Sequence, residues 1–356
     1  MKQFLILFAF ISTVSLQAQD FITEWTITNA TNAIIFNALT EGGAVNYTWS
    51  ASPSGNNGTG SFTQSTPGLV FLGDLNMAAG DVVTLSMTPK NLRRFYIDNG
   101  PHRDRLTNLV QWGSVPWSSM IRAFYGCSNL QISAVDLPNL TGVFSMYEMF
   151  RNCSSLNGPT NINNWNTSTI TNMSEAFKNA TSFNQNLGNW TLNANVNMFN
   201  MLNDSGMDCD HYSATLVGWA ANNPTVTNRN FGASGISYGT SAVNARDILK
   251  NERGWTISFD MPSGDACDLL LSTGNVDFGN QVIVYPNPSS QEFKLKFNKA
   301  YQQIDVEVYN VKGQKVFNQN YGNTDFIALD FHEDSGVYFL KVNSDNQLST
   351  FKIVRN

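Results

Sequence analysis

Apolar residues follow three different patterns along this chain, one after another. From residue 20 to about 98, short stretches such as "EWTIT", "AVNYTWS" and "DVVTLSM" alternate apolar and polar residues, and Gly, Asn and Pro turns separate them. Short strands with frequent turn signals are typical of an all-β sandwich. The alternation therefore predicts an N-terminal β-sandwich over residues 20–98.

A second pattern begins near residue 120 and recurs. In "NMSEAFKNATSF", Met is followed by Phe four residues later, by a small residue after three more, and by another apolar residue after a further three. The methionines of the four copies are 26, 27 and 25 residues apart, and a Trp stands eight residues before three of them. This period is that of leucine-rich repeats, whose units bury their apolar edges only against neighbours. The predicted interior positions are Met120, Phe124, Cys127, Leu130, Met146, Phe150, Cys153, Leu156, Met173, Phe177, Ala180, Phe183, Met198 and Leu202.

Each repeat is expected to form a short strand followed by a single short helical turn. Met and Phe fill the centre, while the small residue lets the turn approach its neighbour. The segments "HYSATLVGWAAN" and "SAVNARDILKNERG" have helical spacing, with Val243, Ile248 and Leu249 on one face of the second. They should close the open end of the stack. The sequence thus predicts a solenoid with a helical cap over residues 99–260 and a linker over 261–281.

The last 75 residues return to strand alternation, with a turn at Lys312-Gly313. The apolar positions of the alternating pattern are Phe293, Leu295, Phe297, Val306, Val308, Val311, Val337, Phe339 and Val342, and they are expected to share the buried side. Residues 282–356 are therefore predicted to form a second β-sandwich, which makes the whole protein mainly β.

The N-terminus has the features of an export signal. Residues 1–19 contain one Lys, an apolar run from Phe4 to Ile11, and small and polar residues near Ala18. A run this short predicts a secretory signal peptide and not a spanning helix. No other segment is long and apolar enough to span a membrane, so we expect an exported protein without a membrane span.

Charge argues against nucleic acid as a partner. Charged residues make up 13% of the chain, about half of the usual share, and the net charge is −6. No extended cationic face is available to neutralise phosphates. One local cluster is basic and has two open interpretations, a solvated domain junction or a site for an anionic ligand: Lys90, Arg93, Arg94, Arg103 and Arg105.

Four cysteines in an exported chain permit disulfides. Cys127 and Cys153 occupy the same small position of two repeats, which predicts stacked, buried thiols. Cys209 and Cys267 lie outside that register, and a disulfide between them or two free thiols both stay open. No Cys or His spacing indicates a zinc site, and no motif indicates a cofactor.

The repeat segment resembles a known family. "WNTSTITNMSEAF" and "ITNMSEAFKNATSFNQNLGNW", with the terminal "YSATLVGWA" and "ILKNERGWTISFD", are similar to BspA-type leucine-rich-repeat surface proteins of bacteria. The resemblance covers roughly residues 105–260 and implies an open, non-catalytic binding surface. Residues 20–98 weakly resemble the Ig-like or polycystic-kidney-disease-like modules that accompany such repeats.

The C-terminal segment resembles the sorting domain of type IX (Por) secretion substrates. The resemblance rests on "VYPNPSSQEFKLKF", "IDVEVYNVKGQKVFNQ", "SGVYFLKV" and "TFKIVRN". It implies an Ig-like sandwich, recognition by the type IX machinery, cleavage by its signal-removing peptidase, and a location outside a Gram-negative cell, released or on the surface. A structural alternative is that the segment is a further binding module. The signature residues carried over are Tyr285, Pro286, Asn287, Pro288, Gly313, Gly336, Tyr338 and Lys341.

One motif favours an enzyme. "GISYG" fits G-x-S-x-G with Ser237 as nucleophile, but such a hydrolase needs an acid and a His later in the chain. The one later His is His332, inside the segment expected to be removed, while His102 and His211 lie upstream in separate segments. We therefore predict no catalytic residues and interpret the motif as a Gly-rich turn.

Two functions follow from these patterns. The first is a secreted or cell-surface binding or adhesion protein that recognises an extracellular glycan or protein through its repeats. The alternative is a secreted hydrolase or a carbohydrate-processing accessory protein, which would require a convergent acid, base and nucleophile in one pocket.

Overall fold

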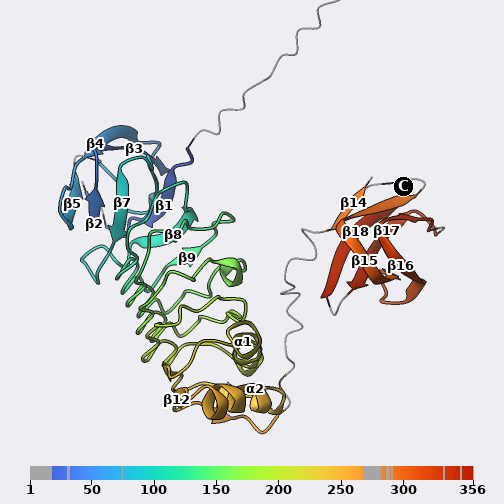
Figure 1. The fold of residues 1–356 in the computed structure, drawn as a ribbon. Coiled ribbons are helices and arrows are strands. Elements are labelled where there is room, and N and C mark those ends of the chain that lie inside the picture. The colour runs from blue at the N-terminus through green and yellow to red at the C-terminus, as the bar shows by residue number, and fades with distance from the viewer. Residues whose placement is uncertain are drawn as a thin grey trace, which may run out of the picture. The chain divides into compact units, whose positions relative to one another are not determined.

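The computed structural model describes residues 18–29, 33–73, 75–265, 267, 282–285, 289, 292–331, 333–344 and 347–355. The protein is mainly β with few helices, and it divides into two compact units, Met1–Asp268 and Leu269–Asn356, each with its own hydrophobic core (Figure 1). Nearly all of the expected signal peptide and most of the expected linker lie outside the described residues.

The first unit begins with two sheets that share one core. Their strand orders are β4-β3-β6-β1-β8-β9 and β5-β2-β7, antiparallel except for the β8–β9 pair. Between the sheets, Phe95 packs against Phe21 and Phe36 with ring centroids 5.1 and 5.0 Å apart. The strands are β1 (Phe21–Thr26), β2 (Ile34–Thr40), β3 (Val45–Ser52), β4 (Asn57–Phe62), β5 (Gly68–Leu72), β6 (Val82–Met87), β7 (Leu92–Tyr96), β8 (Leu106–Gln111) and β9 (Gln131–Ile132).

The larger sheet runs past residue 98, where the alternation predicted the module to end. In β8, Leu106 and Leu109 are buried and pair with Trp25 and Thr23 of β1. The next strand, β9, pairs with β8 in parallel and belongs to the first repeat. Because the first repeat pairs with the edge of this sheet, the sheets and the repeats share a single continuous core.

Four repeat units, starting at Met120, Met146, Met173 and Met198, stack next to the sheets. Single parallel bridges join Ser145 to Asn172 and Asn172 to Asn197. The expected short helical turns are wrong, because hydrogen-bonded turns stand in their place. Two residues per unit have a positive φ, which interrupts helical backbone. They are Arg122, Glu148, Glu175 and Asn200 at the first position, and Gly126, Asn152, Asn179 and Asp204 at the second.

All the predicted interior positions of the repeats are buried, none more than 1% exposed. Phe124, Phe150 and Phe177 form a stack with ring centroids 5.4 and 5.5 Å apart. Backbone N–H groups reach from one unit to the next, as from Phe150 to Ala176 O at 2.8 Å. Stacked rings and backbone hydrogen bonds together fix the register of the units.

Helices and short strands follow the last repeat and lie at the far end of the first unit from β4 (Figure 1). The helix α1 (Cys209–Asn222) starts before the predicted segment because Asp208 caps it, accepting from His211 N at 2.9 Å. In α2 (Val243–Asp247), Val243 is 41% exposed, so the predicted apolar face is wrong at that residue. The other elements are η1 (Ile162–Asn164), β10 (Asn230–Gly232), β11 (Ser237–Tyr238), η2 (Thr240–Ala242), η3 (Ile248–Glu252), β12 (Thr256–Ser258) and β13 (Met261–Pro262).

The second unit is one sheet with the order β14-β15-β17-β18, and β16 pairs with β15. A turn at Gly313, whose φ is 77°, joins β15 to β16, and Gly313 N donates to Asn310 O at 3.0 Å. The buried side of β17 is Tyr338, Leu340 and Val342, so the predicted inward position of Phe339, which is 41% exposed, is wrong. The predicted inward position of Val311 is also wrong, because Val311 lies in the turn after β15 and is 69% exposed. The strands are β14 (Val282–Tyr285), β15 (Phe293–Asn310), β16 (Lys315–Leu329), β17 (Gly336–Ser344) and β18 (Gln347–Arg355).

Candidate binding surface

One surface column of the repeats contains the residue that follows each Met. Its members are Ile121, Tyr147, Ser174 and Phe199. Adjacent units are joined here by backbone hydrogen bonds, from Glu148 N to Ser174 O at 3.1 Å and from Glu175 N to Phe199 O at 2.9 Å. Ser174 is 7% exposed, whereas Phe199 is 55% exposed. The column therefore contains an exposed ring, Phe199, and a partly buried ring, Tyr147, which has the Arg122 guanidinium 5.6 Å from its centre, with the small Ser174 between them.

Polar and aromatic neighbours enlarge this column. Phe144, three residues before Tyr147, is 62% exposed. The side-chain oxygens of Asn172 and Asn197 accept hydrogen bonds from Ser174 N and Phe199 N at 3.0 and 3.1 Å. These bonds fix both amides beside the aromatic rings.

A row of charged side chains runs along the next column. Glu148 is 2% exposed, and it accepts from Arg122 Nε at 2.6 Å and from Arg151. Arg151 also pairs with Glu175 at 2.6 Å, and Lys178 pairs with Glu175 at 3.5 Å. Burial would raise the pKa of Glu148, but hydrogen bonds from the two arginines outweigh it, so the pKa is lowered. Asp98 also pairs with Arg122 at 3.1 Å, and with it the row contains three cations and three carboxylates and is neutral.

The sequence reasoning missed this charged row. Its signal was present, because charged residues stand two and five positions after the Met of successive repeats, as in Glu148 and Arg151 or Glu175 and Lys178. The same applies to Tyr147 and Phe199 one position after the Met. A pattern search restricted to apolar interior positions does not detect such surface columns.

The basic cluster is distributed over β7 and the turns before β8, and most of its members have partners within the protein. Arg93 pairs with Glu41 at 3.0 Å and donates to Lys90 O. Arg94 lies 4.5 Å above the Tyr96 ring, and its Nε is buried. These contacts leave little of the cluster directed at a ligand.

The remaining members of the cluster lie near His102. Arg103 pairs with Asp104 at 3.7 Å, and Arg105 has a buried Nη1 without a hydrogen-bond partner among the described residues. Burial and the nearby Arg105 lower the pKa of His102 to about 4, and its Nδ1 accepts from Ile35 N at 3.0 Å. His102 thus stabilises the start of β2 as a neutral ring.

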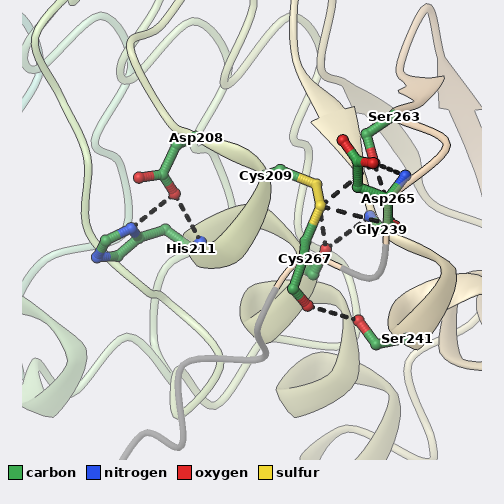
Figure 2. The surroundings of a disulfide bond; sticks show 9 residues. Asp208, Cys209, His211, Gly239, Ser241, Ser263, Asp265 and Cys267 are labelled. Atoms are coloured by element: carbon green, nitrogen blue, oxygen red, sulfur yellow. Dashed lines mark hydrogen bonds and ion pairs between the residues drawn. A yellow bond between two sulfur atoms is a disulfide. The ribbon is translucent and has the colours of Figure 1, made fainter.

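Cys209 and Cys267 form a disulfide across 58 residues, with Cα atoms 5.8 Å apart (Figure 2). Ser241 Oγ donates to Cys267 O at 3.1 Å, and Thr240 N donates to Asp265 O at 2.9 Å. The bond attaches the end of the first unit to the start of α1. Cys127 and Cys153 are buried free thiols in the repeat interior.

No catalytic arrangement forms around Ser237 in the described residues. Ser237 lies in β11 and pairs with Met261. His211 Nδ1 lies 2.8 Å from Asp208 at the N-terminus of α1, and His332 lies outside the described residues. A surface pocket of about 450 Å³ is lined by residues 132–135 and 158–161, none of them titratable.

The described part of the chain contains no group of three or more His, Cys, Asp or Glu side chains suited to a metal ion. In the same residues, no helix has the length and apolar character needed to cross a membrane.

Only some residues of the predicted sorting signature belong to the described part of the chain. Pro286, Asn287 and Pro288 lie outside it. Tyr285, at the end of β14, is 42% exposed. Lys341 Nζ lies 5.0 Å from the centre of the Tyr309 ring on the exposed side of the sheet. The other signature residues lie at the turn after β15 (Gly313) and at the start of β17 (Gly336, Tyr338).

Two segments match known protein families. Residues 118–238 match a family described as Mycoplasma protein of unknown function, DUF285, and residues 283–356 match the secretion system C-terminal sorting domain. The second match indicates that the chain is exported by type IX secretion as a surface or secreted protein. No curated protein matches the chain.

Similar solved structures include three β-glucuronidases, each 9% identical to this chain over 95% of its length. The FMN-binding enzyme from Facaelibacterium prausnitzii L2-6 has a TM-score of 0.17 and is covered over 74% of its length. Two structures of Bacteroides uniformis β-glucuronidase have TM-scores of 0.15, and the chain spans 61% and 60% of their lengths. Scores this low support no conclusion about fold or activity.

Proposed function

We propose that this protein is a non-catalytic binding or adhesion protein of the cell exterior, which recognises an extracellular glycan or protein through its repeats. The observation that carries the proposal is the set of aromatic side chains on stacked, mutually hydrogen-bonded units, the exposed Phe144 and Phe199 and the partly buried Tyr147. Exposed aromatic groups on a rigid scaffold are typical of recognition surfaces.

The architecture behind this proposal is a BspA-type leucine-rich-repeat solenoid. Support comes from the 25 to 27 residue period, the parallel bridges between Ser145, Asn172 and Asn197, and the buried Met and Phe of each unit. The two N-terminal sheets are proposed to be an Ig-like sandwich that covers one end of the solenoid. The segment from α1 to β13 is proposed to cap the other end, as stacked repeats require. The sorting domain is likewise proposed to be an Ig-like sandwich.

The proposal that the protein is not an enzyme rests on the surroundings of its titratable groups. The Nδ1 atom of His102 accepts a hydrogen bond from Ile35 N at 3.0 Å, and the backbone N–H of His211 donates to the helix-capping Asp208 at 2.9 Å. Among the described residues, three carboxylates are buried: Asp81 accepts hydrogen bonds from Ser54 and Ala78, and Glu148 and Asp260 are held by arginines. Asp260 is also bound by Tyr212 Oη at 3.0 Å. Such groups stabilise the fold and are not available to a substrate.

Export completes the proposed function. A signal peptide carries the chain across the inner membrane, the type IX machinery recognises the second unit, and its peptidase cleaves after about residue 280. The product is then attached to the surface or released.

The experiment that tests the binding function is a screen of the purified chain, residues 20–356, on glycan and extracellular-protein arrays. A reproducible ligand supports the proposal. Turnover of a glycoside or ester substrate by the same preparation, abolished by Ser237→Ala, would instead establish a hydrolase.

A further inference from the structure

We propose that the face formed by the exposed Phe144, Phe199 and Asn197 and the partly buried Tyr147 and Asn172, here called the aromatic face, binds an extended, neutral, β-linked glycan. This inference rests on the proposed binding function and specifies its ligand class. It starts from the arrangement of these five side chains.

Spacing is the first argument. Tyr147 and Phe199 occupy the same position in units that are two apart, since Ser145, Asn172 and Asn197 are bridged in register. Adjacent strands lie about 4.8 Å apart, so equivalent positions two units apart are separated by about 10 Å. The repeat of an extended β-linked glycan, from one sugar to the next but one, spans a similar distance, so packing on both rings requires a chain longer than a disaccharide. Ser174, 7% exposed, lies between them and leaves room for the sugar that bridges the two rings.

Hydrogen-bonding capacity is the second argument. Asn172 and Asn197 have their side-chain oxygens fixed by Ser174 N and Phe199 N. Within the described residues, their Nδ2 groups donate no hydrogen bond, so each amide has N–H donors for a ligand. Fixed amide donors beside aromatic rings suit sugars, because the C–H face of a pyranose packs on a ring while its hydroxyls accept hydrogen bonds.

Charge is the third argument. The five members of the aromatic face are uncharged. The Arg122 guanidinium, 5.6 Å from the centre of the Tyr147 ring, is paired with Glu148 and Asp98, and Lys178 of the adjacent row is paired with Glu175. Burying a neutral ligand here requires no desolvation of an unpaired charge. An anionic polysaccharide would have to compete with Glu148 and Glu175 for the arginines. The face is therefore complementary to an uncharged ligand.

The backbone argues against an extended peptide on the same face. Peptides often bind by adding a strand to an open sheet edge. Here the backbone groups already join neighbouring units, as in Met146 N to Asn172 O and Met173 N to Asn197 O, both at 2.8 Å. Recognition must come from side chains, as it does for sugars.

The test uses purified residues 20–356 and isothermal titration with cellobiose and cellohexaose, with affinity electrophoresis in mixed-linkage β-glucan, dextran and heparin. Cellohexaose should bind at least roughly tenfold more tightly than cellobiose, because only the longer chain contacts both rings. Phe199→Ala and Tyr147→Ala should each weaken cellohexaose binding by roughly tenfold. Phe71→Ala is the matched control, since Phe71 is 63% exposed on β5 and outside the aromatic face.

Several outcomes would overturn the inference. Cellohexaose binding that survives both aromatic substitutions, or retardation only by heparin or dextran, contradicts it. So does a protein ligand that is lost in Phe199→Ala while no neutral β-glycan binds. If an array ligand binds equally to wild type and both variants, the binding function stands and the aromatic face is wrong. If no ligand binds at all, both fail.

Discussion

Single side chains in the repeats have sharply different roles, although they are only a few residues apart. Phe177 is fully buried, with ring centroids 5.5 Å from Phe150 and 4.1 Å from Phe183. Phe199 is 55% exposed in the next unit. The residue four positions after each Met is buried in the core, whereas the residue directly after the Met is partly exposed in Ile121 and Tyr147, exposed in Phe199 and buried in Ser174.

Phe177→Ala should lower the free energy of unfolding by about 3 to 5 kcal/mol, because the stacked units cannot collapse onto the cavity. Phe199→Ala should change it by less than about 0.5 kcal/mol. Urea unfolding of both variants measures the difference. Similar losses in the two would show that the register of the repeat is wrong.

Glu148 gives a prediction about pH. Its pKa is lowered in the folded protein, so its contribution to stability is present above the ordinary carboxyl value of 4.5 and is lost as the pH falls through the lower folded value. Glu148→Gln should cost about 2 kcal/mol at pH 7, and this cost should shrink steadily below pH 4.5. Unfolding midpoints measured from pH 7 to pH 3 test this.

The matched control for Glu148 is Glu41→Gln. The Glu41 side chain is 75% exposed where it pairs with Arg93, and surface pairs contribute little. We expect almost no change at any pH. A Glu148→Gln cost that stays constant down to pH 3 would argue against a charge effect.

At the residue scale, the interior positions of the repeats could be predicted from the sequence. The buried side of a strand could not always be predicted. The Met and Phe intervals repeat four times, so each unit supports the others. In "GVYFLKV", by contrast, Val337 and Phe339 on one side of the strand are as apolar as Tyr338 and Leu340 on the other side. A strand's alternate residues face opposite sides of the sheet, and the structure buries the side that contains Tyr338, Leu340 and Val342.

At the scale of the elements, a disulfide holds the end of the first unit in place. The disulfide joins the start of α1 to Cys267 across 58 residues, so it holds β13 and the chain after it against the cap (Figure 2). A loop of that length restricts the unfolded chain strongly.

Cys209→Ser together with Cys267→Ser should lower the free energy of unfolding by about 4 kcal/mol on the loop-entropy estimate. Thermal unfolding of this variant and of the wild type, each with and without reductant, measures it. Cys127→Ser with Cys153→Ser is a separate variant whose response to reductant should match that of wild type. Reductant-insensitive unfolding of the wild type would contradict a stabilising disulfide.

Element boundaries were harder to predict than element types. The strand alternation before residue 98 is recognisable, but β8 and β9 cannot be assigned to the sheet from the sequence, because the pairing of β8 with β1 and of β9 with β8 is a tertiary contact. The single helical turns were wrong for a local reason. Non-Gly residues such as Arg122 and Glu148 adopt positive φ angles, at 53° and 54°. The backbone preferences of these residue types disfavour such angles, and the stacking of the units imposes them.

For the whole molecule, the two units serve separate purposes. The first contains the candidate binding surface, and the second matches a sorting domain over residues 283–356 and has a core of its own. Motif resemblance could identify the second unit from its sequence, since its signature is specific. The aromatic face depends on units stacked in register, so it became apparent only from the bridges between Ser145, Asn172 and Asn197.

Removal of the second unit should abolish export without unfolding the first. Residues 282–356 contain eight basic and eight acidic residues, so truncation before Val282 leaves the net charge unchanged while removing about a fifth of the chain. Any change in location is then due to lost recognition and not to altered charge. In a host with a type IX system, the full chain should reach the exterior and lose residues near the linker. The truncated chain should remain in the periplasm, still folded and resistant to limited proteolysis. Cell fractionation, protease accessibility and mass spectrometry of the exported product measure this. If the truncated chain also reaches the exterior, the second unit is not the sorting signal, and if every exported molecule retains residues 282–356, cleavage does not occur.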